Sequence, residues 1–256
     1  MALFLRQPWF LFLAVSLLLI AGNLAGYKLA VSTSVNEDNH RHEHITGLRE
    51  GLFVLLGLLL GFTVAMVLPR FDQRRGLVDE EAHAIQETWL RADLLPEQQR
   101  GKSMDLMRQY VTVRRDFADQ TLANQESIDR TAQQTRVLQE QLWSQAVEAG
   151  KRDPTAVAAA YLRSLDDMIG VADKRLSAFE NRVPRAVWII ILLVAAFQSF
   201  VSGYSLRQKF WLSHIVAPVI IAVVVALIAD LDDPRTGLIR VDQASMNRVV
   251  MQISSH

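Results

Sequence analysis

The chain contains no cysteine among its 256 residues. Disulfide bonds, thiolate nucleophiles and zinc or iron–sulfur sites with cysteine ligands are therefore excluded. The nucleotide-binding and hydrolase signatures GxxxxGK[ST], GxGxxG after a strand, GxSxG and HExxH are missing as well. Because these motifs position the phosphates, nucleophiles and metals of the common enzyme classes, we expect neither an enzyme nor a bound cofactor.

An excess of charge of either sign is also missing. The 27 Lys and Arg residues balance the 27 Asp and Glu residues, so no basic excess attracts nucleic acid, and we expect no such partner. Half of the residues are hydrophobic, which is too many for an ordinary soluble domain, yet 21% are charged, which is too many for a bundle buried wholly in lipid. Apolar and charged residues must therefore be segregated along the chain.

Four long stretches without charge provide the apolar part. They cover residues 7–27, 51–69, 186–206 and 210–229, and about 20 residues suffice to cross a bilayer. We therefore predict an all-α integral membrane protein with four transmembrane helices arranged as two plus two. An alternative interpretation of the first stretch is a cleaved signal peptide, because small residues follow its apolar run. Its length exceeds that of a usual signal peptide, which favours a membrane span.

Arginine and lysine near the ends of these spans predict their orientation, because cytoplasmic loops are enriched in them. Seven such residues flank the central region, namely Arg70, Arg74, Arg75, Lys174, Arg175, Arg182 and Arg185. We predict that residues 70–185 and both termini are cytoplasmic, including a tail at residues 231–256, and that the loop at residues 28–50 faces outward. Arg207 and Lys209 in the second hairpin oppose this orientation but are outnumbered.

The spans contain few polar side chains and many small residues. Asn23, Thr63, Gln198 and His214 are the polar candidates, and no carboxylate lies in mid-span, so a charged proton or ion relay is not expected. The first span carries a GxxxG pair at residues 22 and 26, and the second has one at residues 57 and 61. Such pairs serve helix packing within one subunit or line a pore.

The central region has a helical pattern throughout. Its first stripe is Val78, Ala82, Ile85, Trp89 and Ala92, with spacings of three and four residues. A second stripe follows Pro96, and a third includes Ile128, Leu138, Leu142 and Trp143. A fourth follows Asp153-Pro154, where we predict that Asp153 is an N-cap and Pro154 the first helical residue. These apolar faces must pack on one another or on a second subunit.

Two polar clusters are candidate sites. His40, His42 and His44 in the outward loop could bind a transition metal or respond to pH near 6.5, or simply be solvated. Glu80 and Glu81 beside Asp79 resemble paired catalytic acids or a cation site, although a solvated helix face is the simpler interpretation.

A third cluster follows the last span. Asp230 and Asp232 lie where a helix C-terminus disfavours carboxylates, which suggests a specific partner such as Arg235 or a basic residue of the central region. A polar turn ending at Gly237 is the simpler interpretation. With Glu80, Glu81, Arg91 and Asp93, these residues are candidates for an ionic network.

Several separated segments together resemble the bacterial bestrophin-like membrane proteins. The matching segments are RFDQRR at residues 70–75, EEAHAI at 80–85, LRADLLP at 90–96, LDDMI at 165–169 and ADLDDPRTGLIRV at 229–241. Bestrophins proper are pentameric ion channels with a pore around the second span, so the resemblance implies a bacterial inner-membrane homo-oligomer that conducts ions. The calcium clasp and aromatic neck of the animal channels have no counterpart here.

Two functions remain open from the sequence. The first is an oligomeric ion channel, with anions as the expected ions, in which Gly57, Gly61 and Phe62 line the path. The second is a membrane-anchored structural or signalling module whose cytoplasmic helices bind a partner. Both place the chain in a lipid bilayer.

Overall fold

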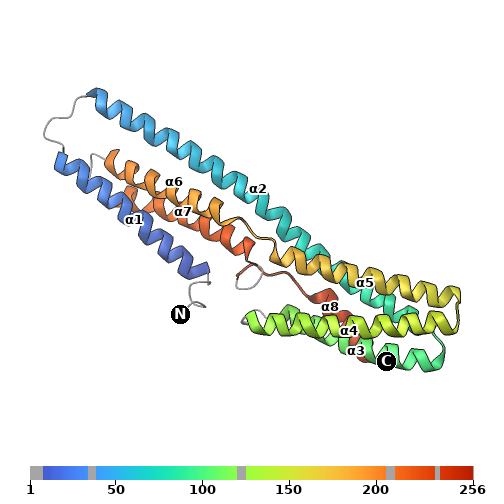
Figure 1. The fold of residues 1–256 in the computed structure, drawn as a ribbon. Helices are drawn as coiled ribbons and strands as arrows, with labels where there is room; N and C mark the ends of the chain where they lie inside the picture. Colours follow the sequence, from blue (N-terminus) through green and yellow to red (C-terminus); the bar gives the residue numbers. More distant parts are fainter. Residues whose placement is uncertain (1–7, 34–38, 120–124, 206–210, 234–236, 256) are drawn as a thin grey trace. The chain divides into compact units, whose positions relative to one another are not determined.

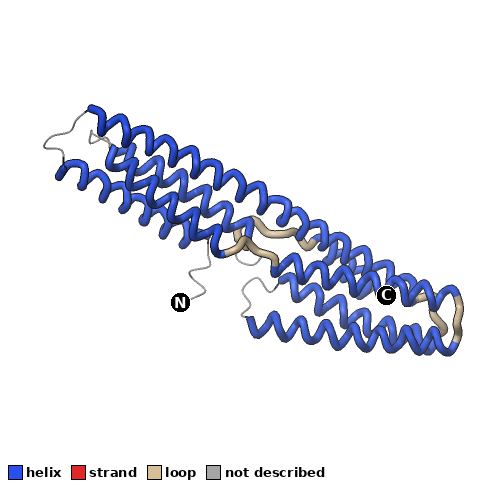
Figure 2. The backbone as a smooth tube through the Cα atoms, turned by 45° about the horizontal axis from the view of Figure 1, so that its top comes forward, coloured by secondary structure: helices blue, strands red, loops and turns tan. Residues whose placement is uncertain are grey.

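The computed structural model describes residues 8–33, 39–119, 125–205, 211–233 and 237–255 (Figure 1). Within these ranges every regular element is a helix and none is a strand (Figure 2), which confirms the predicted all-α class. The helices are α1 (Pro8–Thr33), α2 (Asn39–Ala92), α3 (Glu97–Asp119), α4 (Gln125–Arg152), α5 (Ala156–Glu180), α6 (Arg185–Ser205), α7 (Trp211–Asp232) and α8 (Ala244–Ser254).

The chain divides into two compact units. The first, called the span unit below, consists of Met1–Arg70 and Arg182–Ile239. The second, called the bundle unit, consists of Phe71–Asn181 and Arg240–His256. Each unit is built from segments that lie far apart in the sequence.

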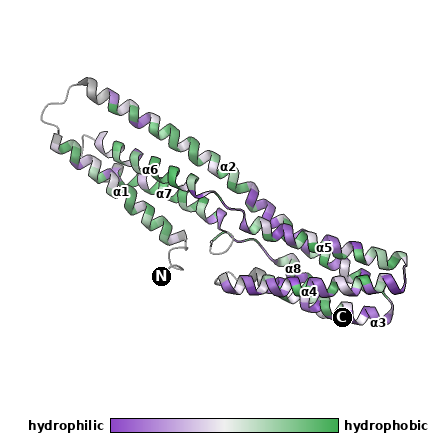
Figure 3. Cartoon of the chain, in the orientation of Figure 1, coloured by the Kyte–Doolittle hydropathy of each residue, from purple (hydrophilic) through white to green (hydrophobic). Residues whose placement is uncertain are grey.

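The span unit holds the apolar helices. Four stretches of the described chain are long and apolar enough to cross a membrane, as predicted. Figure 3 shows the hydrophobic residues concentrated on α1, α6, α7 and the first part of α2. Large apolar side chains such as Leu17, Leu193 and Ile220 are more than half exposed. Exposed apolar side chains are favourable in contact with lipid but unfavourable in contact with water.

The boundaries of α2 differ from the prediction. This helix has 54 residues, or about 80 Å at 1.5 Å per residue, so only its apolar part at residues 51–69 is needed to cross a core of about 30 Å. Pro69, the last residue of the predicted span, lies inside the helix. The stretch 28–50, expected to be a loop, is largely helical, because α1 continues to Thr33 and α2 begins at Asn39. The described parts of this stretch contain no proline to stop either helix.

Glycines bring the helices of the span unit together. A Cβ atom on Gly26 of α1 would overlap the carbonyl oxygen of Phe200 on α6, and one on Gly203 of α6 would overlap that of Asn23 on α1. The first GxxxG pair therefore serves packing within the subunit, as small residues do where two backbones approach closely. Leu19, Ile191 and Ala195 are fully buried in this unit.

The bundle unit buries one apolar face from each of its helices. The predicted stripe from Val78 to Ala92 is confirmed, because all five of its residues belong to the buried core. Trp143 was expected in the core as well, but it is 39% exposed. Its neighbour Leu142 fills the core position of that turn of α4.

Two local features of the bundle unit were not anticipated. The N-cap of α5 is Thr155, whose side chain accepts a hydrogen bond from the Ala158 amide, so the predicted cap at Asp153 is wrong. The cap falls two residues later because α4 continues through Arg152. The predicted tail contains α8, which buries Met246, Val249, Val250 and Ile253 in the core. Their spacing of three, one and three residues is that of a single helix face.

Candidate functional site

The second span presents an unpartnered glycine face. A Cβ atom on Gly57 or Gly61 would meet nothing within 4 Å, in contrast to the glycines of α1 and α6. Phe62 is 64% exposed and Leu58 is 53% exposed. The small residues of α2 therefore do not serve packing within the subunit, and they leave room for another molecule or an open path.

Two of the polar residues predicted in the spans, Asn23 and His214, belong to a buried cluster. The Asn23 side chain of α1 donates a hydrogen bond to the carbonyl oxygen of Ser199 on α6 at 3.1 Å. The oxygen of Asn23 lies 2.5 Å from Nδ1 of His214 on α7. Ser199 Oγ in turn donates to the Leu19 carbonyl oxygen at 2.7 Å. Since polar groups in lipid must be satisfied internally, this cluster fixes the three helices against one another.

The carboxylates after the last span have backbone partners. Asp230 is buried and accepts hydrogen bonds from the amides of Leu238 and Ile239 at 2.7 and 2.9 Å. Asp232 is buried too and accepts from the Val183 amide at 3.0 Å. These bonds have amides as donors, and Asp233 of the same segment pairs with Arg182 at 3.3 Å. A basic partner for Asp230 and Asp232 stays a prediction. Arg235 lies outside the described residues.

The strongest ionic site is in the bundle unit. Glu81 of α2 is fully buried between Arg114 of α3 and Arg175 of α5, and one carboxylate oxygen faces each guanidinium. Burial alone would raise the pKa of Glu81, but the two arginines outweigh it and hold the pKa below its ordinary value. Arg175 also donates to the Gln243 side chain at 2.9 Å. The solvated-face interpretation is therefore wrong for Glu81.

The remaining members of the predicted ionic network do not join this site. Glu80 is exposed. Arg91 contacts Glu87 at 2.5 Å and donates to the Ala160 carbonyl oxygen at 3.1 Å. Asp93 pairs with Arg100 at 3.3 Å, and both side chains are about half exposed. The described members of the predicted network therefore make several separate contacts, and Glu81, Asp230 and Asp232 are the buried ones among them.

The histidine candidates stay a prediction. His40 and His42 lie in the first turns of α2, not in a loop, and their side chains are outside the described part of the chain. His44 is exposed. Among the side chains that the structure describes, no group of three or more His, Asp or Glu could hold a metal ion.

Sequence reasoning missed the arginine partners of Glu81. A signal was present, because Met107, Val111 and Arg114 follow one another at helical spacing, and Arg175 occupies a similar stripe position between Ala172 and Phe179. An arginine at a core position of an apolar stripe indicates a buried ion pair.

Comparison with known proteins identifies the family. The model of the Bestrophin-like domain matches residues 14–246, which is most of the chain. The chain belongs to the bestrophin-like family. No curated protein sequence matches it.

Solved structures agree with the bestrophin-like fold. A variant of a bacterial Bestrophin homologue from Klebsiella pneumoniae is 15% identical and has a TM-score of 0.66, covering 97% of this chain and 99% of that chain. A second variant of that homologue is 12% identical with a TM-score of 0.67, covering 96% and 97%. A structure described as a membrane protein is 15% identical with a TM-score of 0.66, covering 97% of both chains. The predicted resemblance is confirmed, and nothing in these comparisons favours the partner-binding module.

Proposed function

We propose that this bestrophin-like protein is an oligomeric ion channel in which copies of α2 surround the ion path. The observation that carries the proposal is the contrast between its two GxxxG pairs. Gly26 approaches the backbone of α6 within the subunit, whereas Gly57 and Gly61 approach nothing. A glycine face that no neighbouring helix of the subunit covers is suited to a central axis shared by several subunits.

The side chains of this face suit an uncharged constriction. Phe62 follows Gly61 directly and is 64% exposed, so it provides the bulk that the glycines lack. Residues 51–69 contain no charged side chain. Rings of apolar side chains are known devices for gating by dewetting.

The charges flanking the second span favour anions. Within six residues of either end stand four arginines (Arg49, Arg70, Arg74 and Arg75) and two carboxylates (Glu50 and Asp72). Three of these arginines and one carboxylate lie at residues 70–75, whereas Arg49 and Glu50 balance at the other end. Repeated around a ring of subunits, the excess of positive charge at residues 70–75 attracts anions to that mouth of the path.

The proposal includes the orientation predicted from the sequence. Residues 70–185 and both termini lie in the cytoplasm of a bacterium, and the protein is in the inner membrane. Accessibility labelling of single cysteines introduced into α4 and near Lys28 measures this directly. Labelling of α4 from outside intact cells would contradict the orientation.

Purified protein in liposomes tests the channel. We expect a ring-like oligomer by native mass spectrometry and chloride flux that exceeds potassium flux. The Phe62→Ala variant should change the flux, because it removes the bulk at the proposed constriction. Phe197→Ala is the matched control, since Phe197 on α6 is 53% exposed and lies on a different span. A monomer, or liposomes that pass no ions, would overturn the proposal, and equal effects of both variants would overturn the role of Phe62.

A further inference from the structure

A cavity of about 450 Å³ lies in the bundle unit between α2 and α8. Its volume falls in the range of roughly 300–1,000 Å³ that is usual for small-molecule sites. The hydroxyl of Ser245 on α8 donates to Asp79 of α2 at 2.5 Å, and Gln86 of α2 donates to Gln252 of α8 at 3.2 Å. Because the apolar face of α8 is also buried in the core, the two walls of the cavity are held firmly together.

Three basic side chains line this cavity. Arg75 and His83 come from α2, and Arg248 comes from α8. In the part of the chain that the structure describes, Arg75 and His83 make no hydrogen bond or ion pair. Arg248 donates to the Ser245 hydroxyl at 3.1 Å and pairs with no described carboxylate. All three are exposed, so a ligand can reach them from water.

The two carboxylates of the cavity already have donors within the protein. Asp79 accepts from the Ser245 hydroxyl, and Asp242 accepts from the Ala244 amide at 3.0 Å. The basic side chains outnumber them and still have N–H groups without an acceptor among the described residues. A ligand that fits this cavity must therefore supply oxygen acceptors and negative charge.

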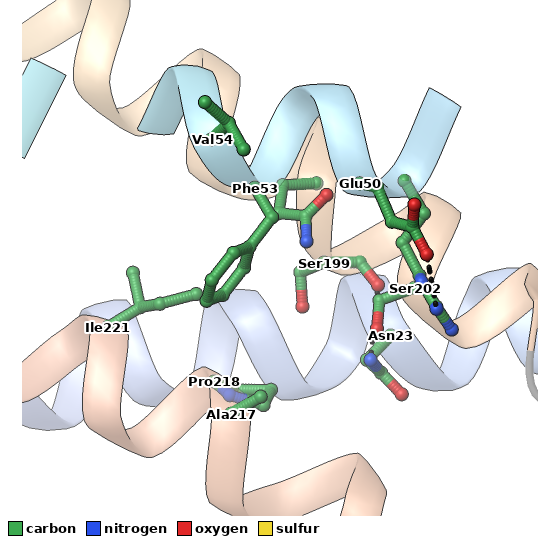
Figure 4. A pocket seen from close by; sticks show the side chains of 11 residues that line it. Asn23, Glu50, Phe53, Val54, Ser199, Ser202, Ala217, Pro218 and Ile221 are labelled. Atoms are coloured by element: carbon green, nitrogen blue, oxygen red, sulfur yellow. Dashed lines mark hydrogen bonds and ion pairs between the residues drawn. The ribbon is translucent and has the colours of Figure 1, made fainter. Parts of the chain in front are cut away.

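The cavity of the span unit, drawn in Figure 4, has the opposite pattern. It measures about 340 Å³, and its two charged side chains, Arg49 and Glu50, lie 3.8 Å apart, so they balance each other. Arg49 also lies 3.5 Å from the Ser205 hydroxyl. The arginines of the bundle cavity have no such carboxylate, and this difference favours the bundle cavity as an anion site.

Two guanidiniums favour an oxyanion over a halide ion. A guanidinium presents its N–H groups as a planar fork that matches two oxygens of one anion. A phosphomonoester has three terminal oxygens and carries about two negative charges at pH 7, so it can satisfy three basic groups at once. A carboxylate has only two oxygens and one charge.

We infer that this cavity binds a phosphomonoester group. Arg75 and Arg248 bind its terminal oxygens from opposite walls, His83 donates a further hydrogen bond, and the remaining volume accommodates the part of the ligand that carries the phosphate. No bond is made or broken. Arg75 stands only six residues beyond the apolar stretch 51–69, so a lipid headgroup as well as a soluble ester can supply the phosphate. The inference concerns binding and does not depend on ion conduction.

Glycerol 3-phosphate is the probe, and glycerol is its matched control without the phosphate. Calorimetric titration of the full chain in detergent, in a buffer free of phosphate, measures the binding. We expect glycerol 3-phosphate to bind and glycerol not to bind. Arg75→Gln and Arg248→Gln should each weaken the binding about tenfold, which is the effect of losing one hydrogen bond to a charged group. Both side chains are exposed, so these changes leave the bundle core intact.

Arg136→Gln is the matched control variant, because Arg136 is exposed on α4 and lies outside the cavity. It removes the same charge and should leave the affinity unchanged. A wild-type chain that does not bind glycerol 3-phosphate would overturn the inference. An equal loss of affinity in all three variants would also overturn it, because overall charge and not the cavity would then attract the probe. Unchanged affinity in both cavity variants would overturn the assignment of the site.

Nanodiscs distinguish the two sources of the phosphate. The chain is placed in phosphatidylcholine nanodiscs that contain phosphatidic acid, whose headgroup is a phosphomonoester, or phosphatidylglycerol, which is anionic but a diester. Loss of glycerol 3-phosphate binding with phosphatidic acid alone would support the site and identify a lipid headgroup as its ligand. Binding that persists with both lipids would support the site and identify a soluble ester. Equal loss with both lipids would overturn the preference for a monoester.

Discussion

Replacing Glu81 by glutamine should destabilise the bundle unit far more than the same change elsewhere on α2. The Glu81 side chain is 0% exposed, and those of Arg114 and Arg175 are 4% and 8% exposed. The amide has the shape of the carboxylate but no charge, so two buried guanidiniums lose the carboxylate that faces both of them. Breaking a buried ion pair in this way costs about 3–5 kcal/mol. That is a large part of the roughly 5–15 kcal/mol that stabilises an average domain.

Thermal unfolding of the detergent-purified protein measures this loss. Trp89 is one of five tryptophans and is 3% exposed in the same core, so its contribution to the fluorescence reports the unfolding of the bundle unit. For a protein of this size, a loss of 3–5 kcal/mol corresponds to a fall in Tm of roughly 10 °C. Glu87→Gln is the matched control, because Glu87 pairs with Arg91 but is 54% exposed. An exposed pair of that kind contributes about 1 kcal/mol at most.

The origin of the loss can be separated from a packing effect. Adding Arg175→Met to Glu81→Gln removes one of the two guanidiniums that have lost this carboxylate, so part of the lost stability should return. Equal Tm values for Glu81→Gln and Glu87→Gln would refute the reasoning, because they would mean that the buried carboxylate does not balance the arginines.

The same site predicts how stability depends on pH. The arginines hold the pKa of Glu81 below its ordinary value of 4.5, so the unfolded chain binds this proton more readily than the folded one. The stabilisation is therefore complete above about pH 4.5 and is lost as the pH falls further through the lowered pKa. Between pH 5 and pH 3, the Tm of the wild-type chain should fall more steeply than that of Glu81→Gln, and parallel curves would contradict this.

Four further substitutions test the fold by thermal unfolding in detergent. Gly26→Ala places a methyl group against the backbone of α6 and should cost about 1–3 kcal/mol, whereas Gly57→Ala meets nothing within 4 Å and should cost nothing within the subunit. Thr155→Ala removes the N-cap of α5 and should cost about 1 kcal/mol, and an unchanged Tm would count against the cap. Asp230→Ala leaves two backbone amides without their acceptor and should cost about 1–3 kcal/mol, and a variant as stable as the wild type would show that water replaces the carboxylate.

Most of the fold could be predicted from local sequence patterns. Uninterrupted apolar stretches predicted the four spans, and the stripe from Val78 to Ala92 predicted a buried face, because both signals arise from neighbours within a few turns. The ends of α2 were mistaken because hydropathy reports where lipid begins, not where the helix stops. The helix α8 was overlooked because its 11 residues offer only four core positions.

The sites depend on contacts that no local pattern specifies. Glu81 meets partners 33 and 94 residues away in the sequence. The partner of Asn23 on α7, His214, is 191 residues away. Nothing in the composition of one segment selects such a partner. The resemblance to the bestrophin-like family gave the arrangement of the helices, but it did not indicate which of their polar side chains meet.

The position of α8 has a consequence for biosynthesis. This helix follows α7 in the chain, yet its apolar face completes the core that α2, α3, α4 and α5 share. During translation those helices leave the ribosome well before α8 does, so the part of the core that α8 covers stays exposed until then. The bundle unit can therefore reach its native state only after the final membrane helix has been synthesised, and until then its core surface is a target for chaperones.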